Sequence, residues 1–328
     1  MVARSVPQRV GKMAAMDAQA LLDEANACHD GDPLRGAELL RRIHAHALEP
    51  KQWPLLAFLF NHVLGEKLGL WSDAHGRNAE LAGLAGGSQP VLRHAAVAAS
   101  LAGDVAAAAA LCHALATAAH SSQAQAAELV QLAATALRLP SLPAAPAAAQ
   151  TQAALAVLSA NHWLMKNELD VPAAAQCNNL GSHLVDRPLA DLAVPELRAA
   201  LEHAANCAQR LWQRAGSWVN HERACYLRAL AASAQGDATA ALAHASEGLA
   251  LLDEHDTGNA ETVDRAFLGL EESFALHRLG RTDEAAASRS KADVFAAAFG
   301  DDALRSWFND RVARNATLLN GQLAFQKI

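Results

Sequence analysis

A glycine followed directly by an aspartate, Gly236-Asp237, separates two helix-forming stretches at residues 220–235 and 237–252. Glycine ends a helix readily because it accepts the left-handed backbone without a steric penalty. An aspartate at the next position caps the following helix by accepting hydrogen bonds from its first free amides. The second stretch also carries small residues on the side that must meet the first. The pattern predicts two helices joined by a tight turn.

Turns of this kind recur along the chain. Gly31, Gly69 and Gly103 are separated by 38 and 34 residues, and Gly280 comes 44 residues after Gly236. The pair Leu169-Asp170 comes 66 residues after Gly103, and Gly236 comes 67 residues after Leu169. Stacked helix pairs repeat with a period of about 34 residues, so the longer spacings correspond to two repeats. Because one helix pair cannot bury its apolar face alone, we expect neighbouring pairs to stack along the chain.

The composition favours helices throughout the chain. Hydrophobic residues make up 52% of the 328 residues, but aromatic residues only 5%. Much of the apolar share is alanine, the best helix former, whereas the strand-favouring residues valine and isoleucine are scarce. We therefore predict an all-α fold, with helices at residues 16–29, 33–47, 51–68, 71–85, 90–102, 104–119, 122–138, 147–168, 172–185, 195–215, 218–235, 237–253, 259–279, 281–298 and 301–319.

Proline divides this array of helices. The stretch 139–146 contains three prolines, which remove backbone donors and clash with the preceding helical turn. We expect a connector there between helical repeats at 16–138 and at 147–300. The alternative is a long loop within a single array. Residues 1–15 are expected to form a flexible N-terminal arm.

Residues 301–328 are expected to form a capping helix and a tail. This helix would cover the open apolar edge of the last repeat, with Arg305, Arg311 and Arg314 on its solvated side. In the alternative arrangement, an exposed patch at Trp307 and Phe308 would make a homodimer through this helix.

The turns and their small neighbours resemble the tetratricopeptide repeat (TPR) family, best over residues 218–298 and fairly over 51–119. That family places a small residue early in the second helix, where two backbones approach closely. The matching positions here are all small: Gly36, Ala74, Ala108, Ala174, Ala241 and Ala285. The bulky first-helix positions of the family are mostly unmatched. The resemblance implies a divergent α-solenoid, a right-handed superhelix of antiparallel helix pairs. Residues 277–286 also look like repeats of bacterial signalling and transcription regulators.

In such a superhelix the first helix of each pair lines the concave surface. The family's groove positions fall here on aromatic side chains interleaved with cations, which suits a peptide that carries carboxylates. The candidate binding residues are Arg93, Trp163, Lys166, Arg223, Tyr226, Phe267, Phe274 and His277. The alternative is that the aromatic members simply pack between repeats. The Lys and Asn clamp of chaperone-docking family members is missing, so chaperone tails are not expected as ligands.

Cysteine and histidine share helix faces in two places. His203 and Cys207 are four residues apart, as are His221 and Cys225. Together with Cys177, these side chains could form a buried tetrahedral zinc layer. The alternative is that the cysteines are small core residues, because the short-spaced ligands of closed zinc sites are missing. We predict no metal site and no cofactor, and leave this cluster open.

The remaining features argue against several classes of function. Carboxylate pairs lie in polar settings, and no strand precedes a phosphate loop or a nucleophile, so no catalytic site is predicted. The net charge of −7 disfavours nucleic acid as the main partner. The longest apolar stretches fall short of the roughly 18 residues that a membrane span needs. Five cysteines without a short-spaced framework fit a reducing, cytoplasmic location.

Two functions are compatible with these expectations. The first is a non-catalytic scaffold that binds a protein or peptide in its concave groove, in bacterial regulation or signalling. The alternative is a small-ligand sensor with a pocket in the central region, residues 147–235, lined by Trp163, Asn178, Trp212 and His221. The sequence does not name the partner.

Overall fold

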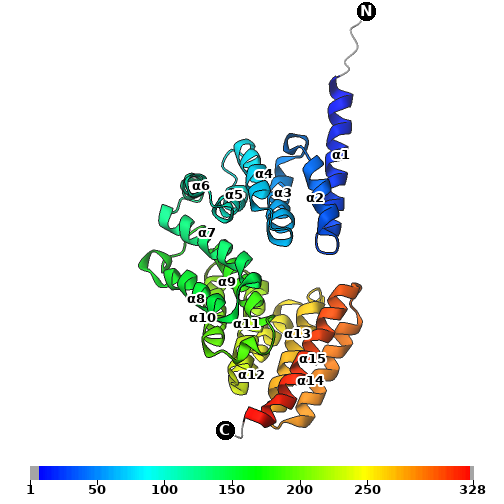
Figure 1. Ribbon diagram of the computed structural model, residues 1–328. Coiled ribbons are helices and arrows are strands. Elements are labelled where there is room, and N and C mark those ends of the chain that lie inside the picture. The colour runs from blue at the N-terminus through cyan, green and yellow to red at the C-terminus, as the bar shows by residue number, and fades with distance from the viewer. Residues whose placement is uncertain (1–6, 326–328) are drawn as a thin grey trace, which may run out of the picture. The chain divides into compact units, whose positions relative to one another are not determined.

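The computed structural model describes the backbone of residues 7–325 and the side chains of residues 17–160 and 162–320. Within these limits it contains fifteen α-helices and no strand (Figure 1). Helices that are neighbours in the sequence pack as adjacent pairs. The predicted all-α class is therefore confirmed. The chain forms two compact units, which are described one at a time.

The first unit comprises residues 1–138 together with 161–169. The segment 161–169 rejoins this unit after residues 139–160. Its Trp163 is fully buried, and the indole nitrogen donates to Glu128 over 2.7 Å. The segment also accepts a hydrogen bond at the carbonyl of His162 from Gln125, over 2.6 Å. The helices of this unit are α1 (Pro7–Cys28), α2 (Pro33–Arg42), α3 (Trp53–Leu59), the π-helical turn η3 (Phe60–Lys67), α4 (Trp71–Leu84), α5 (Gln89–Ala102), α6 (Val105–Ala118) and α7 (Gln123–Arg138).

The second unit comprises residues 139–160 and 170–328. Its helices are α8 (Ala144–Ala156), α9 (Asp170–Val185), α10 (Pro195–Ala215), α11 (Trp218–Gln235), α12 (Ala238–His255), α13 (Thr262–Arg278), α14 (Thr282–Ala297) and α15 (Asp302–Phe325). The pairs α9–α10, α11–α12 and α13–α14 are the most extensively packed of this unit.

The Gly-Asp turns form as the sequence predicts. Gly236 has a φ of +89°, and the carboxylate of Asp237 accepts a hydrogen bond from the amide of Ala240 over 2.9 Å. Gly103 has a φ of +84°, and Asp104 caps α6 in the same way. Glycine supplies the left-handed residue and aspartate satisfies an amide that the helix cannot.

Helices of the second unit approach one another closely at glycines. A Cβ on Gly181 of α9 would lie 2.7 Å from Leu227 of α11, and one on Gly248 of α12 would lie 2.9 Å from Leu268 of α13. Of the six small positions predicted at helix crossings, five are buried: Gly36, Ala74, Ala174, Ala241 and Ala285. Small side chains therefore let these backbones meet.

Five predicted helices are wrong in extent. The helix predicted at 16–29 begins at Pro7, and the helix predicted at 301–319 continues to Phe325. The predicted helix 147–168 ends at Ala156 and gives way to single 3-10 turns. The predicted helix 33–47 ends at Arg42, and the predicted helix 51–68 changes from α to π geometry at Phe60. The predicted connector 139–146 overlaps the start of α8, where Pro146 occupies the first turn and needs no amide donor. All side chains of the predicted arm, residues 1–15, lie outside the described residues, and the described backbone from residue 7 onward belongs to α1.

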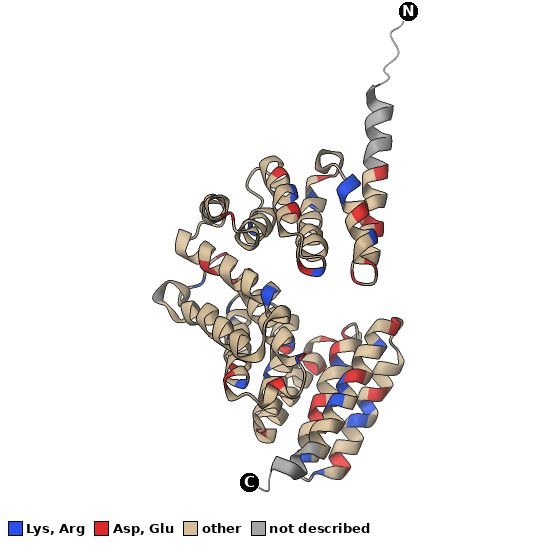
Figure 2. Cartoon of the chain, viewed as in Figure 1, with Lys and Arg blue, Asp and Glu red and all other residues tan. Residues whose placement is uncertain are grey.

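Charge is unevenly distributed along the chain. Figure 2 shows both acidic and basic residues along α13, α14 and α15, whereas α6 and α8 carry no Asp, Glu, Lys or Arg. By length and apolar character, no single helix in the described residues qualifies as a membrane span. One helix pair, Val105–Ala118 with 123–141, is long and apolar enough for a span when both helices are taken together, but the two are bent by 118° at their junction.

Candidate binding groove in the second unit

Helix α15 lies against the first helices of the packed pairs α9–α10, α11–α12 and α13–α14. Its side chains line the same cavities as residues of α9, α11 and α13, and in Figure 1 it runs beside α13. We call the space bounded by α9, α11, α13 and α15 the inner groove. The sequence predicted a helix here that caps the last repeat, and α15 does cover apolar residues of α13.

Apolar packing holds one end of α15. Phe308 is 2% exposed, and its ring meets Phe267 of α13 edge-on at 5.4 Å between centroids. Trp307 also contacts Phe267, at 4.4 Å, but remains 43% exposed. The alternative of an exposed patch at Trp307 and Phe308 therefore does not hold for Phe308, because this ring lies in the core.

Polar contacts hold the rest of α15. Arg311 donates to the carboxylate of Asp186 over 2.8 Å, and Arg314 donates to the carbonyl of Arg187 over 2.9 Å. The amide of Asn315 donates to Glu271 of α13 over 3.0 Å. Arg311 is only 4% exposed. The prediction that Arg311 belongs to the solvated side of this helix is wrong, because its side chain is buried against Asp186. Arg314 is half-buried, and Arg305 is exposed as predicted.

Two cavities lie in the inner groove, and Arg311 lines both. The larger has a volume of about 390 Å³ and the smaller about 250 Å³. Leucine and valine side chains form the apolar wall of the larger cavity. Four arginines also line it: Arg198, Arg278, Arg311 and Arg314.

The arginines of the larger cavity are held mainly by neutral acceptors. Arg278 donates to the carbonyls of Ser233 and Gly236, at 3.2 and 2.9 Å. Arg198 donates to the carbonyls of Leu192 and Ala193, at 2.7 and 3.0 Å. Carbonyls fix the direction of a guanidinium group but do not cancel its charge.

Glu271 is the one carboxylate among the described residues that line the larger cavity, so the formal charge of the lining is four minus one, or +3. Asp186, which pairs with Arg311 from outside this lining, reduces the excess to +2. Burial raises the pKa of Glu271, against the effect of the nearby Arg311. Burial also lowers the pKa of Arg314, and the charge of Arg311 acts in the same direction. A cavity with this excess of positive charge favours an anionic ligand.

Several buried polar atoms of the described groove residues make no hydrogen bond in the structure. At the larger cavity they are Oγ of Ser233, Oε2 of Glu271 and Nη2 of Arg314. At the smaller cavity they are Oδ1 of Asn178 and the hydroxyl of Tyr226. Buried polar atoms are normally paired with protein, water or ligand. These five atoms therefore offer donors and acceptors to a molecule inside the groove.

An acidic cluster borders the smaller cavity. Arg223 bridges Asp264 and Glu261, both at 3.0 Å, while Glu222 beside it is fully buried. Burial, followed by repulsion from Asp264, raises the pKa of Glu222 to about 9. This carboxyl group is therefore protonated at neutral pH.

Five of the eight predicted binding residues belong to the second unit. Arg223, Tyr226 and Phe267 line the smaller cavity. Phe274 is 4% exposed and packs under the guanidinium of Arg278, and His277 is exposed. The structure thus brings three predicted residues together, while the aromatic rings of Phe267 and Phe274 serve mainly in packing.

The other three predicted residues belong to the first unit. Trp163 is fully buried, Arg93 is half-buried and Lys166 is exposed. Burial of Trp163 makes it a packing residue. Two residues of the predicted small-ligand pocket fall in different units. Trp163 belongs to the first unit, whereas Asn178 belongs to the second unit and lines its smaller cavity.

The five residues of the possible zinc layer separate into two groups. Cys177, His203 and Cys207 interact with one another. His221 and Cys225 instead lie beside Glu247, and the possible ligand atoms of these three residues are within 4.8 Å of one another. All five cysteines of the chain are free thiols.

The arginines of the larger cavity were missed as site residues from the sequence. Arg198, Arg278, Arg311 and Arg314 come from three helices that are far apart in the chain, and no short motif links them.

Comparison of the chain with known protein families and with curated proteins gives no match.

Proposed function

We propose that this protein is a non-catalytic, TPR-like binding scaffold of the bacterial cytoplasm that takes an acidic protein or peptide segment into the inner groove. The observation that carries the proposal is the larger cavity, with four arginines, an apolar wall and buried polar atoms without partners. Arginine suits carboxylates because its guanidinium donates two parallel hydrogen bonds. The apolar wall would hold a neighbouring hydrophobic side chain of the same segment.

The repeat pairs α9–α10, α11–α12 and α13–α14 support the TPR-like part of the proposal. Each pair places its first helix toward the inner groove, and Gly236-Asp237 forms the turn that the resemblance requires. Helix α15 lies where a ligand of such an array would lie. It shows that this surface holds a helix through aromatic packing and arginine contacts.

A small organic anion is the second candidate ligand. A volume of about 390 Å³ falls within the roughly 300–1,000 Å³ of small-molecule sites. The carboxylate or phosphate of such a ligand would use the same arginines.

The test is fluorescence anisotropy with a labelled peptide of alternating glutamate and leucine, in parallel with thermal unfolding in a panel of organic carboxylates and phosphates. Arg278→Gln and Arg314→Gln each remove one cation from the cavity. Arg281→Gln is the matched control, because Arg281 is bound to Glu284 at the surface and does not line this cavity.

We expect each cavity variant to weaken binding by about tenfold or more, since a hydrogen bond to a charged group contributes about 1.5–3 kcal/mol. A small anion at 100 times its Kd would raise stability by about 2.7 kcal/mol in the wild type and less in the variants. Equal binding by wild type and both cavity variants, or no binding of either ligand class, contradicts the proposal.

A further inference from the structure

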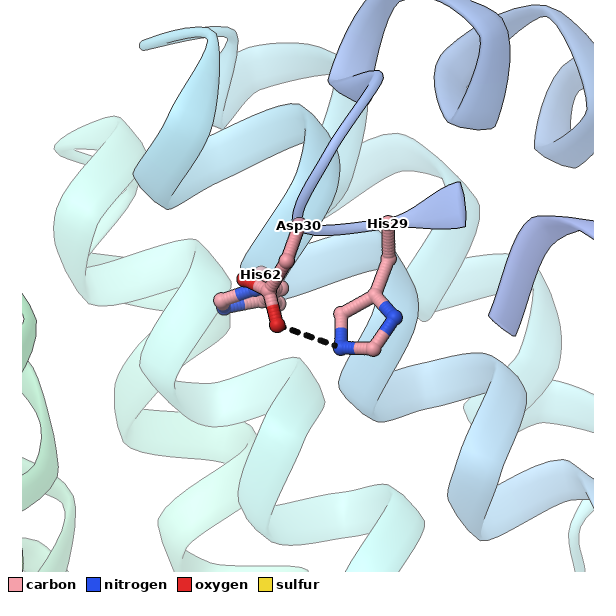
Figure 3. Close-up of side chains that lie close together, drawn as sticks. All are labelled: His29, Asp30 and His62. Carbon is pink, nitrogen blue, oxygen red and sulfur yellow. Dashed lines mark hydrogen bonds and ion pairs between the residues drawn. The ribbon is translucent and has the colours of Figure 1, made fainter. Parts of the chain in front are cut away.

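We propose that the first unit holds a divalent transition-metal ion between the turn that follows α1 and the π-helical turn η3. His29, Asp30 and His62 present three ligand atoms within 4.8 Å of one another. Figure 3 shows the carboxylate of Asp30 between the two imidazole rings. Two imidazole nitrogens and one carboxylate oxygen form a ligand set that zinc and iron(II) accept with coordination positions left open.

Two short segments with defined backbones bring these residues together. The turn at 29–32 is closed by the hydrogen bond from the amide of Asp32 to the carbonyl of Cys28, at 2.8 Å, and Asp32 then caps α2. His62 lies in η3, a π-helical segment. Such segments are rare and are found often at functional sites.

Hydrogen bonds fix the tautomers of both histidines. Nδ1 of His29 lies 2.5 Å from the carbonyl of Asn26, and Nδ1 of His62 lies 2.7 Å from the carboxylate of Glu66. A carbonyl or a carboxylate can only accept, so both Nδ1 atoms must carry the proton. Each Nε2 then points toward Asp30, at 3.2 Å for His29 and 3.1 Å for His62.

This pattern is the one that metal-binding histidines usually show. A metal-ligating histidine almost always donates its other ring nitrogen to a carbonyl or a carboxylate, which orients the ring and raises its basicity. Asn26 and Glu66 supply these two acceptors. The arrangement therefore includes the outer partners of a metal site as well as its ligands.

Lys67 is the cation that pairs with Asp30 in the structure. Its Nζ lies 2.9 Å from the oxygen of Asp30 that also faces Nε2 of His62. A metal would compete with Lys67 for this carboxylate oxygen, and with protons for the ring nitrogens.

The test uses the full-length, tag-free chain after chelator treatment, titrated with ZnCl₂ by calorimetry and with Co²⁺ by visible absorption. All proteins carry His221→Ala, so that the separate cluster of His221, Cys225 and Glu247 does not contribute. The variants are His29→Ala, His62→Ala, Glu66→Gln and Lys67→Gln. His46→Ala is the control, because His46 is also an exposed histidine of the first unit but stacks on His44 outside the cluster.

We expect one Zn²⁺ per chain, a tetrahedral Co²⁺ spectrum, and unchanged binding in His46→Ala. Glu66→Gln should weaken binding by about 10- to 100-fold, as loss of an outer-shell partner does, and loss of either histidine should weaken it more. Lys67→Gln should strengthen binding, because it removes a competing cation. No binding by the His221→Ala parent protein, or equal affinity in this parent and in its His29→Ala derivative, would overturn the proposal. Circular dichroism checks that each variant is folded.

Discussion

Replacing Glu222 by glutamine tests whether a buried, protonated carboxyl group limits stability at neutral pH. The pKa of Glu222 is about 9 in the folded chain and 4.5 for the ordinary side chain. A raised folded pKa means that the folded state holds a proton that the unfolded state releases. Stability from this group is fully present below pH 4.5 and falls as the pH rises toward 9.

The magnitude follows from these two values. The ordinary pKa of 4.5 lies 2.5 pH units below pH 7. Each pH unit corresponds to about 1.4 kcal/mol, so the free energy of unfolding falls by up to roughly 3 kcal/mol by pH 7. Glutamine has nearly the same shape as glutamate but does not ionise, so its stability contribution does not change with pH. We therefore expect Glu222→Gln to be more stable than the wild type at pH 7, and the difference to shrink toward pH 5.

The assay is urea unfolding followed by helical circular dichroism at pH 5, 6, 7 and 8. Glu254→Gln serves as the control, because its carboxylate is 72% exposed in the same unit. Parallel pH profiles for the wild type and Glu222→Gln would refute the reasoning, since another group would then control the slope.

Three further changes test the packing. Arg214→Met deprives the buried carboxylate of Asp170 of a cation at 2.5 Å and should lower the free energy of unfolding by about 3–5 kcal/mol in urea titrations. Gly65→Ala places a Cβ 2.3 Å from the ring of Trp71, and the forced shift should cost about 1–3 kcal/mol, with a changed tryptophan emission spectrum. Phe308→Ala removes the buried ring that packs α15 against α13 and should lower the free energy of unfolding by about 3–5 kcal/mol. Faster proteolysis of α15 is the check.

Local features of this chain could be predicted from its sequence because neighbouring residues cause them. Gly236 and Asp237 adopt their conformations for reasons contained in the residues themselves, and the helices 195–215 and 218–235 begin and end where predicted. The helix predicted to continue through 168 failed because the return of Trp163 to the first unit overrides local helix propensity.

The sites depend on contacts that no local pattern contains. Arg311 faces inward only because α15 lies against α9 and α13, and sequence periodicity alone gave no reason for that rotation. His29 and His62 are 33 residues apart and meet through a π-helical turn. The change from α to π geometry shifts the rotation of His62 about the helix axis, so a pattern based on 3.6 residues per turn misplaces it.

The path of the chain between the two units has a consequence for synthesis on the ribosome. Residues 161–169 complete the first unit, where Trp163 meets Glu128 and Glu168 accepts from Gln89 over 2.9 Å. When residue 138 has emerged, this unit therefore still lacks a buried tryptophan that is encoded 25 residues later. Helix α8, which belongs to the second unit, emerges in the interval before its partner α10 exists. Vectorial folding thus passes through a stage in which both units are incomplete, and chaperones would meet the chain at this stage.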